Sequence, residues 1–406
     1  MKTVGIIGAG ASGMMAAISA RNHGAEVMLF EHNDRVGKKI LSTGNGRCNF
    51  TNIDQKPEYY RSDNPGFANA VLSQFSVSDT ISFFLKLGVY SKNKNGYLYP
   101  NSEQASSVLD VLRFELERLQ ISIYTNTVIT SVCKTKKGFQ LQTPQKTFSC
   151  DSLILAAGSK AAPVTGSDGS GYDIAKSFGH HFVPVLPALV QLKCSEKFYK
   201  NLAGVRTHGT VSLYADDTFL AADTGELQLT KYGISGIPVF QISRFASRAL
   251  YEKKTVTAEI DFMPDFNDHA FTAFLDARIQ SRPDKTLSTF FIGLFPSKVA
   301  DTWISLSRID RNKKVGELSD DEFDRLIRLI KHFRTDVTDT NGFASAQICC
   351  GGIATEEINS KTMESALVEQ LYFSGEIIDV DGICGGYNLQ WAWSSGYVAG
   401  KEAAVC

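Results

Sequence analysis

A glycine-rich turn near the amino terminus constrains the fold of this chain more than any other feature. Residues 3–7 are β-branched or small and apolar, Gly8-Ala9-Gly10-Ala11-Ser12-Gly13 follows, and an alanine-rich stretch runs to about Asn22. A second apolar run, residues 27–30, ends at Glu31. This is G-x-G-x-x-G between a strand and a helix, with an acid about 20 residues further on. The pattern predicts a dinucleotide-binding βαβ unit and hence an α/β, Rossmann-like fold.

Each part of this unit has an expected physical role. Gly8 permits the tight turn, Gly10 lets the backbone approach a pyrophosphate, and Gly13 lets the helix pack close to the strand. The helix amino terminus then faces the phosphate charge. Glu31 is placed to accept hydrogen bonds from a ribose diol. This unit alone does not separate FAD from NAD.

Two later segments favour FAD. Residues 121–152 alternate like three short antiparallel strands, and a buried strand over residues 153–157 follows, ending at Gly158. Residues 371–376 predict another strand, which leads through Gly385-Gly386-Tyr387-Asn388 into a helix over about 389–401. Such a glycine-rich junction can aim backbone N–H groups at an anionic ring or a phosphate. A flavin dinucleotide offers both targets.

The loop GKKILSTGNGRCNFTN, residues 37–52, combines cations with glycines and has neither helical nor strand periodicity. Lys38 and Lys39 are either solvated surface charges or partners of the cofactor phosphates. Arg47 lies inside the glycine-rich part, which favours a functional role. Cys48 is interpreted as a packing residue.

Composition excludes several classes of function. The formal net charge of −1 gives no global attraction to nucleic acid, and no apolar run is long enough to span a bilayer. Nucleic acid is therefore an unlikely partner, and a cytoplasmic location is expected because no signal-peptide layout is present. The eight cysteines show neither C-x-x-C nor zinc spacing, so no metal site is expected. Reduced thiols are the expectation, with a redox-active Cys349-Cys350 pair as the lesser alternative.

The domain organisation follows from where these segments lie. Residues 1–188 and 344–406 are expected to form the FAD-binding domain. Residues 189–262 contain short alternating runs typical of a small β-barrel, and residues 263–343 are expected to be helical, with a capping box at 319–322. Residues 231–236, within the barrel segment, are either the part that reaches the cofactor or a plain hairpin turn.

Taken together, the motifs resemble the bacterial NAD(P)/FAD-dependent oxidoreductases related to aminoacetone oxidase and the flavin-dependent bile acid reductases. The resemblance rests on GAGASG, the loop 37–52, LILAAGS with the following TGSDGSGYDIAKSFGH, TKYGISG, and LYFSGEIIDVDGICGGYNLQWAWSSGYVAGK, and it spans nearly the whole chain. It implies a Rossmann-like FAD-binding domain of the glutathione reductase type, with an inserted β-barrel and a small helical subdomain.

The resemblance also implies cofactor-binding residues. The first glycine loop would hold the FAD pyrophosphate, Glu31 the adenosine ribose, and Lys38 and Lys39 the phosphates. The rest of the loop would line the flavin half, Val128 would contact adenine, and the terminal junction would bind the ribityl chain and the pyrimidine edge. The full set is Gly8, Gly10, Ala11, Ser12, Gly13, Glu31, Lys38, Lys39, Thr43, Gly44, Asn45, Gly46, Arg47, Cys48, Asn49, Val128, Ala157, Gly158, Gly375, Glu376, Asp379, Gly386, Tyr387, Asn388 and Leu389.

The expected function is hydride transfer between NAD(P)H and a small unsaturated or carbonyl compound through bound FAD. No second G-x-G-x-x-G is present, so NADH or NADPH either binds transiently or is not used. Two alternatives stay open: an FAD-dependent oxidase of an amine or alcohol, and a flavin-bearing redox-regulatory or RNA-associated protein. No catalytic side chain is identified, because His180-His181 is interpreted as a helix end. The oligomeric state is not predicted.

Overall fold

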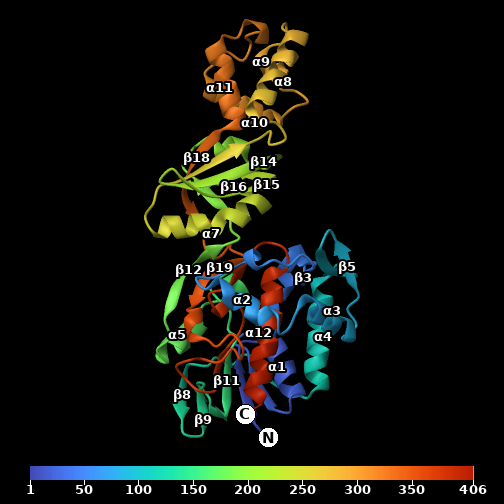
Figure 1. Cartoon of the computed structure of the whole chain (residues 1–406), viewed down its shortest axis with the longest axis vertical. Coiled ribbons are helices and arrows are strands. Elements are labelled where there is room, and N and C mark those ends of the chain that lie inside the picture. The colour runs from blue at the N-terminus through green and yellow to red at the C-terminus, as the bar shows by residue number, and fades with distance from the viewer. Residues whose placement is uncertain (406) are drawn as a thin grey trace. The chain divides into compact units, whose positions relative to one another are not determined.

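The protein, described here over residues 1–405 from a computed structural model, divides into two compact units. Unit 1 comprises Met1–Leu186 and residues 347–405, and unit 2 comprises Pro187–Ala346 (Figure 1). No helix among the described residues is long and apolar enough to cross a membrane.

Unit 1 is built on a five-stranded parallel sheet. The strand order is β20 (Leu371–Phe373), β11 (Ser152–Leu155), β1 (Thr3–Ile7), β2 (Glu26–Phe30) and β7 (Ser122–Tyr124). Helix α1 (Ala11–Asn22) connects β1 to β2, as the glycine motif predicts. The Rossmann-like fold class is therefore confirmed.

Smaller elements surround this sheet. The expected meander is present as β8 (Ser131–Thr135), β9 (Gly138–Gln142) and β10 (Thr147–Cys150). The other sheets pair β3 (Thr51–Asn52), β6 (Tyr97–Pro100) and β5 (Ser91–Lys94); β4 (Tyr60–Arg61) and β21 (Asp381–Gly382); and β12 (Phe182–Ala188) and β19 (Ile348–Ile353). The helices are α2 (Pro65–Leu72), α3 (Val77–Lys86), α4 (Ala105–Arg118), α5 (Ser170–Ser177) and α12 (Tyr387–Ala404), and the 3₁₀ segments are η1 (Lys38–Gly46), η2 (Pro57–Tyr59), η3 (Pro163–Thr165), η5 (Thr355–Glu357) and η6 (Gly375–Ile377).

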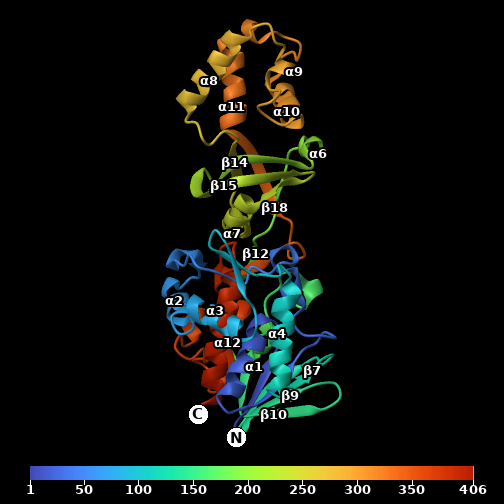
Figure 2. The ribbon, with the colours of Figure 1, turned by 90° about the vertical axis from the view of Figure 1, so that its right-hand side faces the viewer.

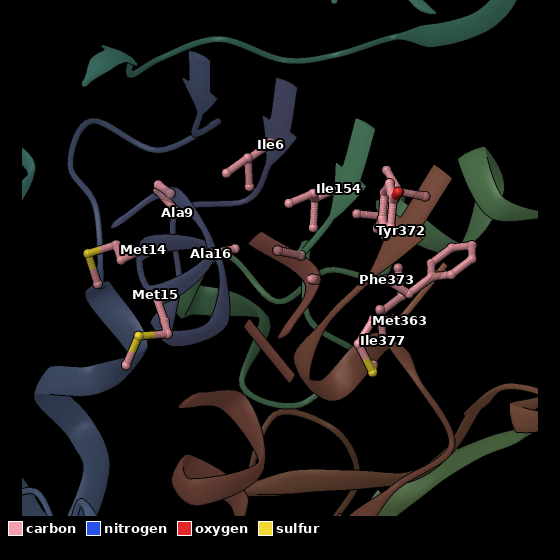
Figure 3. Close-up of a cluster of buried hydrophobic side chains, with 14 of the residues drawn as sticks. Ile6, Ala9, Met14, Met15, Ala16, Ile154, Met363, Tyr372, Phe373 and Ile377 are labelled. Atoms are coloured by element: carbon pink, nitrogen blue, oxygen red, sulfur yellow. The ribbon is translucent and has the colours of Figure 1, made fainter. Parts of the chain in front are cut away.

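The core of unit 1 joins the sheet to two closely packed helices. Ile6, Ile154 and Tyr372 occupy matching register positions on β1, β11 and β20 and lie in one row in Figure 3. Figures 1 and 2 both show α12, in red, alongside α1, in blue. A Cβ atom at Gly396 or Gly400 of α12 would lie only 2.4 or 2.2 Å from a carbonyl oxygen of α1. These glycines therefore permit the close contact between the helices.

Unit 2 contains a closed six-stranded barrel. Its order is β13 (Leu192–Cys194), β16 (Gly233–Gly236), β15 (Thr218–Thr230), β14 (Val205–Ala215), β17 (Val256–Asp261) and β18 (Phe333–Thr340), and β18 pairs with β13 to close it. Helix α7 (Ile237–Tyr251) follows β16, and α6 (Tyr199–Leu202) precedes β14. Between β17 and β18 the chain forms α8 (Asp268–Ser281), α9 (Leu287–Phe290), α10 (Ser297–Ser307), η4 (Val315–Glu317) and α11 (Asp320–Lys331).

The end of the segment expected to be helical is a barrel strand instead. Residues 333–340 form β18, in which Phe333, Thr335 and Val337 are buried and the residues between them are exposed. This period of two is typical of a strand with one face in a core. The expected capping box of α11 is present, since Ser319 Oγ accepts from the N–H of Glu322, and the Glu322 carboxylate accepts from the N–H of Ser319.

Residues 231–236 begin in a tight hairpin. Thr230 pairs with Gly233, so only Lys231 and Tyr232 lie outside the ladder, and the N–H of Tyr232 donates to Thr230 Oγ1. The local geometry is therefore that of the plain hairpin turn, one of the two interpretations of this segment.

Candidate cofactor-binding site

A cleft in unit 1 lies at the carboxyl ends of the parallel strands. It runs from Glu31, which follows β2, past the glycine loop after β1 and Ala156 after β11, to Glu376 after β20. Ligands of open parallel sheets bind at this edge. The expected residues that line it are Gly8, Gly10, Ala11, Ser12, Glu31, Lys38, Lys39, Thr43, Val128, Ala157, Gly158, Glu376, Asn388 and Leu389.

The three motif glycines have different structural roles. Gly8 has a φ of 101°, and a Cβ atom there would lie 2.5 Å from the carbonyl oxygen of Ala156. A Cβ atom on Gly13 would lie 1.9 Å from the carbonyl oxygen of Gly8. Gly10 differs, because a Cβ atom there would meet no atom within 4 Å. Gly8 and Gly13 are thus needed because the packed backbone leaves no room for a side chain. At Gly10 the lack of a side chain instead leaves space open in the cleft.

Two helices begin at the cleft without a side-chain cap. Gly10 is the N-cap of α1 and Gly386 that of α12, and neither helix has an acidic residue in its first turn. Ala11 and Ser12 of α1, and Asn388 and Leu389 of α12, line the cleft. Unpaired N–H groups and the positive ends of both helix dipoles therefore favour an anionic ligand.

Glu31 is largely satisfied by the protein and keeps a position for a ligand. Its Oε2 accepts from the backbone N–H of Ala9 at 3.0 Å, and its Oε1 accepts from the N–H and the side-chain amide of Asn33 at 2.9 and 2.7 Å. A carboxylate has about four acceptor positions. One position on Oε2 remains for a hydroxyl group, so Glu31 both fixes the turn and can receive a ribose.

Lys38 and Lys39 are paired rather than freely solvated. Lys38 Nζ lies 2.7 Å from Asp34 Oδ1, and Lys39 Nζ lies 2.7 Å from Glu376 Oε2. The other carboxylate oxygen of Glu376, Oε1, is buried and accepts no hydrogen bond from any residue that the structure describes. Because Glu376 lines the cleft, this oxygen is an acceptor for a ligand hydroxyl.

The loop residues after Thr43 do not line the cleft: residues 44–47 are exposed, and Cys48 and Asn49 are buried. Cys48 is fully buried, and burial raises the pKa of its thiol to about 12. Asn49 Oδ1 is buried, and a Cβ atom on Gly386 would lie 3.0 Å from it. The expected loop residues that do not line the cleft are Gly44, Asn45, Gly46, Arg47, Cys48 and Asn49.

The remaining expected residues make contacts within the protein. Gly13 packs against the backbone of Gly8, and Gly375 packs against the side chain of Ser12, since a Cβ atom on Gly375 would lie 2.4 Å from Ser12 Oγ. Asp379 is buried and accepts from the N–H of Asp63 at 3.0 Å. Tyr387 is buried and donates its hydroxyl to the carbonyl of Asp54 at 2.9 Å. The expected residues outside the loop that do not line the cleft are Gly13, Gly375, Asp379, Gly386 and Tyr387.

Sequence reasoning missed one wall of the cleft. The segment between β11 and α5 contributes it, and α5 begins at the cleft after Gly169 with a φ of 84°. The glycine and aspartate run TGSDGSG was the available signal, since such runs mark turns at helix starts. The unassigned polar residues that line the cleft are His32, Asn33, Thr127, Thr165, Ser167, Asp168, Ser170 and Gln347.

His180 and the pair Cys349-Cys350 are held within the protein. His180 lies beyond the end of α5, and its ring nitrogens are 3.0 Å from Glu357 Oε2 and 2.9 Å from Ser365 Oγ. Cys349 and Cys350 are buried on β19, and burial raises the pKa of the Cys349 thiol to about 11. The described cysteines form no disulfide, and no group of metal-ligating side chains occurs among the described residues.

Comparison with known proteins places this fold and cleft in a family. Residues 2–402 match the family described as HI0933-like protein Rossmann domain. The chain is 45% identical, over 100% of its length and 99% of the relative, to the 3-dehydro-bile acid delta(4,6)-reductase of Clostridium scindens. It is 34% identical, over 97% of its length and 96% of the relative, to the ribosomal RNA dihydrouridine synthase of Haemophilus influenzae.

The fold is also similar to a solved structure, the open conformation of a flavocytochrome c3 fumarate reductase. The TM-score is 0.53 at 16% identity, covering 99% of this chain and 78% of that chain. This similarity establishes the fold alone. Together with the glycine motif, the cleft and the two curated relatives, it leads to one conclusion: the chain belongs to the HI0933-like family and is an FAD-dependent oxidoreductase of the Rossmann type.

Proposed function

We propose that this protein is an FAD-dependent reductase that adds two hydrogens to a carbon–carbon double bond conjugated with a carbonyl group in a small apolar molecule. The observation that carries the proposal is the 45% identity, over the whole chain, to a protein named a 3-dehydro-bile acid delta(4,6)-reductase. That name describes reduction of double bonds next to a 3-oxo group. Dihydrouridine is likewise the product of reducing a double bond conjugated with a carbonyl, so the two curated names share one chemistry.

The residues of the cleft fit FAD. The open space at Gly10 and the uncapped start of α1 suit a pyrophosphate, because a backbone that approaches closely can donate several N–H groups to it. The remaining acceptor position of Glu31 suits the adenosine ribose, and the unpaired Oε1 of Glu376 suits a ribityl hydroxyl. When bound, FAD supplies hydride transfer to and from its ring system.

The protein contributes binding and charge stabilisation. The start of α12, at Asn388 and Leu389, lines the cleft, and its positive dipole end would stabilise negative charge on the pyrimidine edge of a bound flavin. Asn388 holds this junction, since its side chain bonds both the N–H and the carbonyl of Gly382 at 2.8 and 2.9 Å. Lys39 offsets the charge of Glu376 within the cleft.

The proposed electron donor is NADH or NADPH, which would bind transiently. The competing assignment is an oxidase that takes electrons from an amine or alcohol and passes them to oxygen. Anaerobic stopped-flow distinguishes them: the oxidised flavin absorbance should bleach with NADH or NADPH and return when a 4-ene-3-oxo steroid is added. No bleaching by either nucleotide, together with bleaching by an amine or alcohol, would reject the reductase in favour of the oxidase.

RNA is a second candidate substrate, favoured by the relatives named for ribosomal RNA. They are 34% and 31% identical to this chain, against 45% for the bile acid reductase. Neither unit has an excess of cations: residues 187–346 contain 21 Lys and Arg and 21 Asp and Glu. Binding of an RNA backbone relies on such an excess. Reoxidation of the reduced protein by unmodified ribosomal RNA, but not by the steroid, would shift the assignment to RNA.

A further inference from the structure

We infer that Arg47, Lys92 and Lys94 form an anion-binding site that holds the acidic group of the substrate, beside the cleft end made by Thr43 and Asn388. The inference rests on the proposed reductase function and deepens it: the substrate would be a flat apolar molecule that carries a carboxylate. We call these three cations and Glu103, the carboxylate between them, the cationic cluster.

The cluster carries an excess of positive charge. Lys92 contacts one oxygen of Glu103, Lys94 Nζ lies 2.8 Å from the other, and Arg47 Nη1 lies 3.9 Å from that same oxygen. One carboxylate thus stands among three cations. The lysine contacts lower the pKa of Glu103 to about 2, so it remains ionised at neutral pH and the cluster has a net charge of about +2.

Arg47 is the member available for a ligand. Its guanidinium makes no hydrogen bond to any residue that the structure describes, and its side chain is 49% exposed. Its backbone is fixed, because its N–H donates to the carbonyl of Gly44 at 3.2 Å and the next residue, Cys48, is fully buried. A guanidinium with open donors on a fixed backbone suits a carboxylate, which it can bind through two parallel hydrogen bonds.

Close contacts join the cluster to the cleft. A Cβ atom on Gly44 would lie 2.9 Å from the backbone nitrogen of Asn49 and 3.5 Å from the ring of Tyr99. Asn49 Oδ1 lies 3.0 Å from where a Cβ atom on Gly386, the N-cap of α12, would stand. Thr43, next to Gly44, and Asn388, two residues after Gly386, both line the cleft. The cluster is therefore close to the part of the cleft that Thr43 and Asn388 line, where the flavin half of FAD is proposed to lie.

Apolar surface lies beside the cations. Tyr97, 38% exposed, has its ring 2.7 Å from where a Cβ atom on Gly385 would stand, and Lys94 Nζ lies 5.4 Å from the ring centre of Tyr99. Ile53 is exposed next to Gly96, in the turn that precedes Tyr97. Aromatic and aliphatic surface next to a guanidinium with open hydrogen-bond donors matches a flat hydrocarbon with one acidic group.

The two lysines inside the cleft do not offer such a site. Lys38 and Lys39 each have a carboxylate at 2.7 Å, from Asp34 and Glu376. Their charges are thus balanced one to one. In the cationic cluster, by contrast, three cations surround one carboxylate.

The test compares binding of an acid with binding of its neutral ester. Oxidised holoenzyme is titrated with 3-oxo-4-cholenoic acid and with its methyl ester, and the flavin absorbance shift reports each Kd. We expect the wild-type protein to bind the acid about tenfold more tightly, which corresponds to about 1.4 kcal/mol. Arg47→Ala should bring the ratio close to one and leave the Kd of the ester unchanged. Glu103→Gln should raise the ratio, and it keeps the inference testable if Arg47→Ala folds poorly.

Arg113→Ala is the matched control, since Arg113 is exposed on α4 and paired with Asp110. It should leave both Kd values unchanged. An acid-to-ester ratio that is the same in wild-type, Arg47→Ala and Glu103→Gln proteins would overturn the inference. So would a loss of NADPH binding relative to NADH in Arg47→Ala with an unchanged ratio, because the cations would then bind a nucleotide phosphate.

These binding data also separate the inference from the proposed function. Preference for the acid without reduction of its double bond would leave the anion site standing and reject the reductase. Reduction of acid and ester with equal Kd values would support the reductase and reject the anion site.

Discussion

Replacing Gly10 by alanine should separate cofactor binding from folding. A Cβ atom there meets nothing within 4 Å, and Gly10 has a φ of −78°, which alanine adopts without strain. Such a substitution stabilises a protein by about 0.4–1 kcal/mol through the unfolded chain. The apoprotein should therefore melt at the wild-type temperature or slightly above it.

The same methyl group occupies the space that a pyrophosphate needs next to the start of α1. A hydrogen bond to a charged group is worth about 1.5–3 kcal/mol, so loss of one would weaken FAD binding roughly 10- to 150-fold. The assay is titration of deflavinated protein with FAD by quenching of flavin fluorescence, with thermal melting of the apoprotein in parallel.

Two control variants help to interpret the melting temperature and FAD affinity of Gly10→Ala. Gly66→Ala, in the first turn of α2 where the nearest atom would be 3.8 Å away, should melt like Gly10→Ala and bind FAD like the wild type. Gly8→Ala should fold poorly, because its Cβ atom would lie 2.5 Å from the carbonyl oxygen of Ala156. Wild-type FAD affinity in Gly10→Ala would refute the placement of the pyrophosphate.

Three further outcomes are expected. Glu31→Ala should weaken FAD binding. It should also lower the melting temperature of the apoprotein, because it removes the acceptor for the N–H groups of Ala9 and Asn33. A change in FAD affinity alone, or in melting temperature alone, would contradict the proposal that Glu31 both binds the ribose and fixes the turn. Burial lowers the pKa of His180 below its ordinary 6.5, so the unfolded state binds the proton more readily than the folded state. The contribution of His180 to the free energy of unfolding should therefore be complete above pH 6.5 and decline as the pH falls below it. In denaturant unfolding, His180→Gln should flatten this pH dependence. Lys331→Met should destabilise unit 2 by about 3 kcal/mol in urea unfolding, since the buried ammonium donates to Asp261 and to two carbonyls; an unchanged midpoint would show that the ion pair contributes nothing.

The βαβ unit could be predicted because its signals are local. Gly13 packs on Gly8, and Glu31 accepts from Ala9 and Asn33, so these contacts stay within one continuous segment, and the strand, turn and helix follow from the order of its residues. The strand β18 was missed for the opposite reason. Its residues 333–340 follow a helix in sequence, and their partners in β13 and β17 are about 70 to 150 residues away.

The residues expected at the site were likewise predictable in part. Gly10, Ser12 and Glu31 line the cleft as expected, and their contact with FAD stays a prediction. Arg47 does not line the cleft, and the loop that holds it, with left-handed conformations at Gly44, Asn45 and Cys48, brings its guanidinium to 3.9 Å from Glu103; its contact with the flavin half stays a prediction. Glycine and asparagine favour that conformation, but the sequence does not say which way the chain then turns.

The way unit 2 joins unit 1 has an evolutionary consequence. The chain leaves unit 1 near Leu186 and re-enters at Gln347, on strands β12 and β19, which pair with each other. An insertion whose two ends leave from neighbouring strands can be lengthened, replaced or removed as one block while the surrounding sheet keeps its register. Descendants of one ancestral flavoprotein could therefore diversify through this block, with the dinucleotide-binding half inherited almost unaltered.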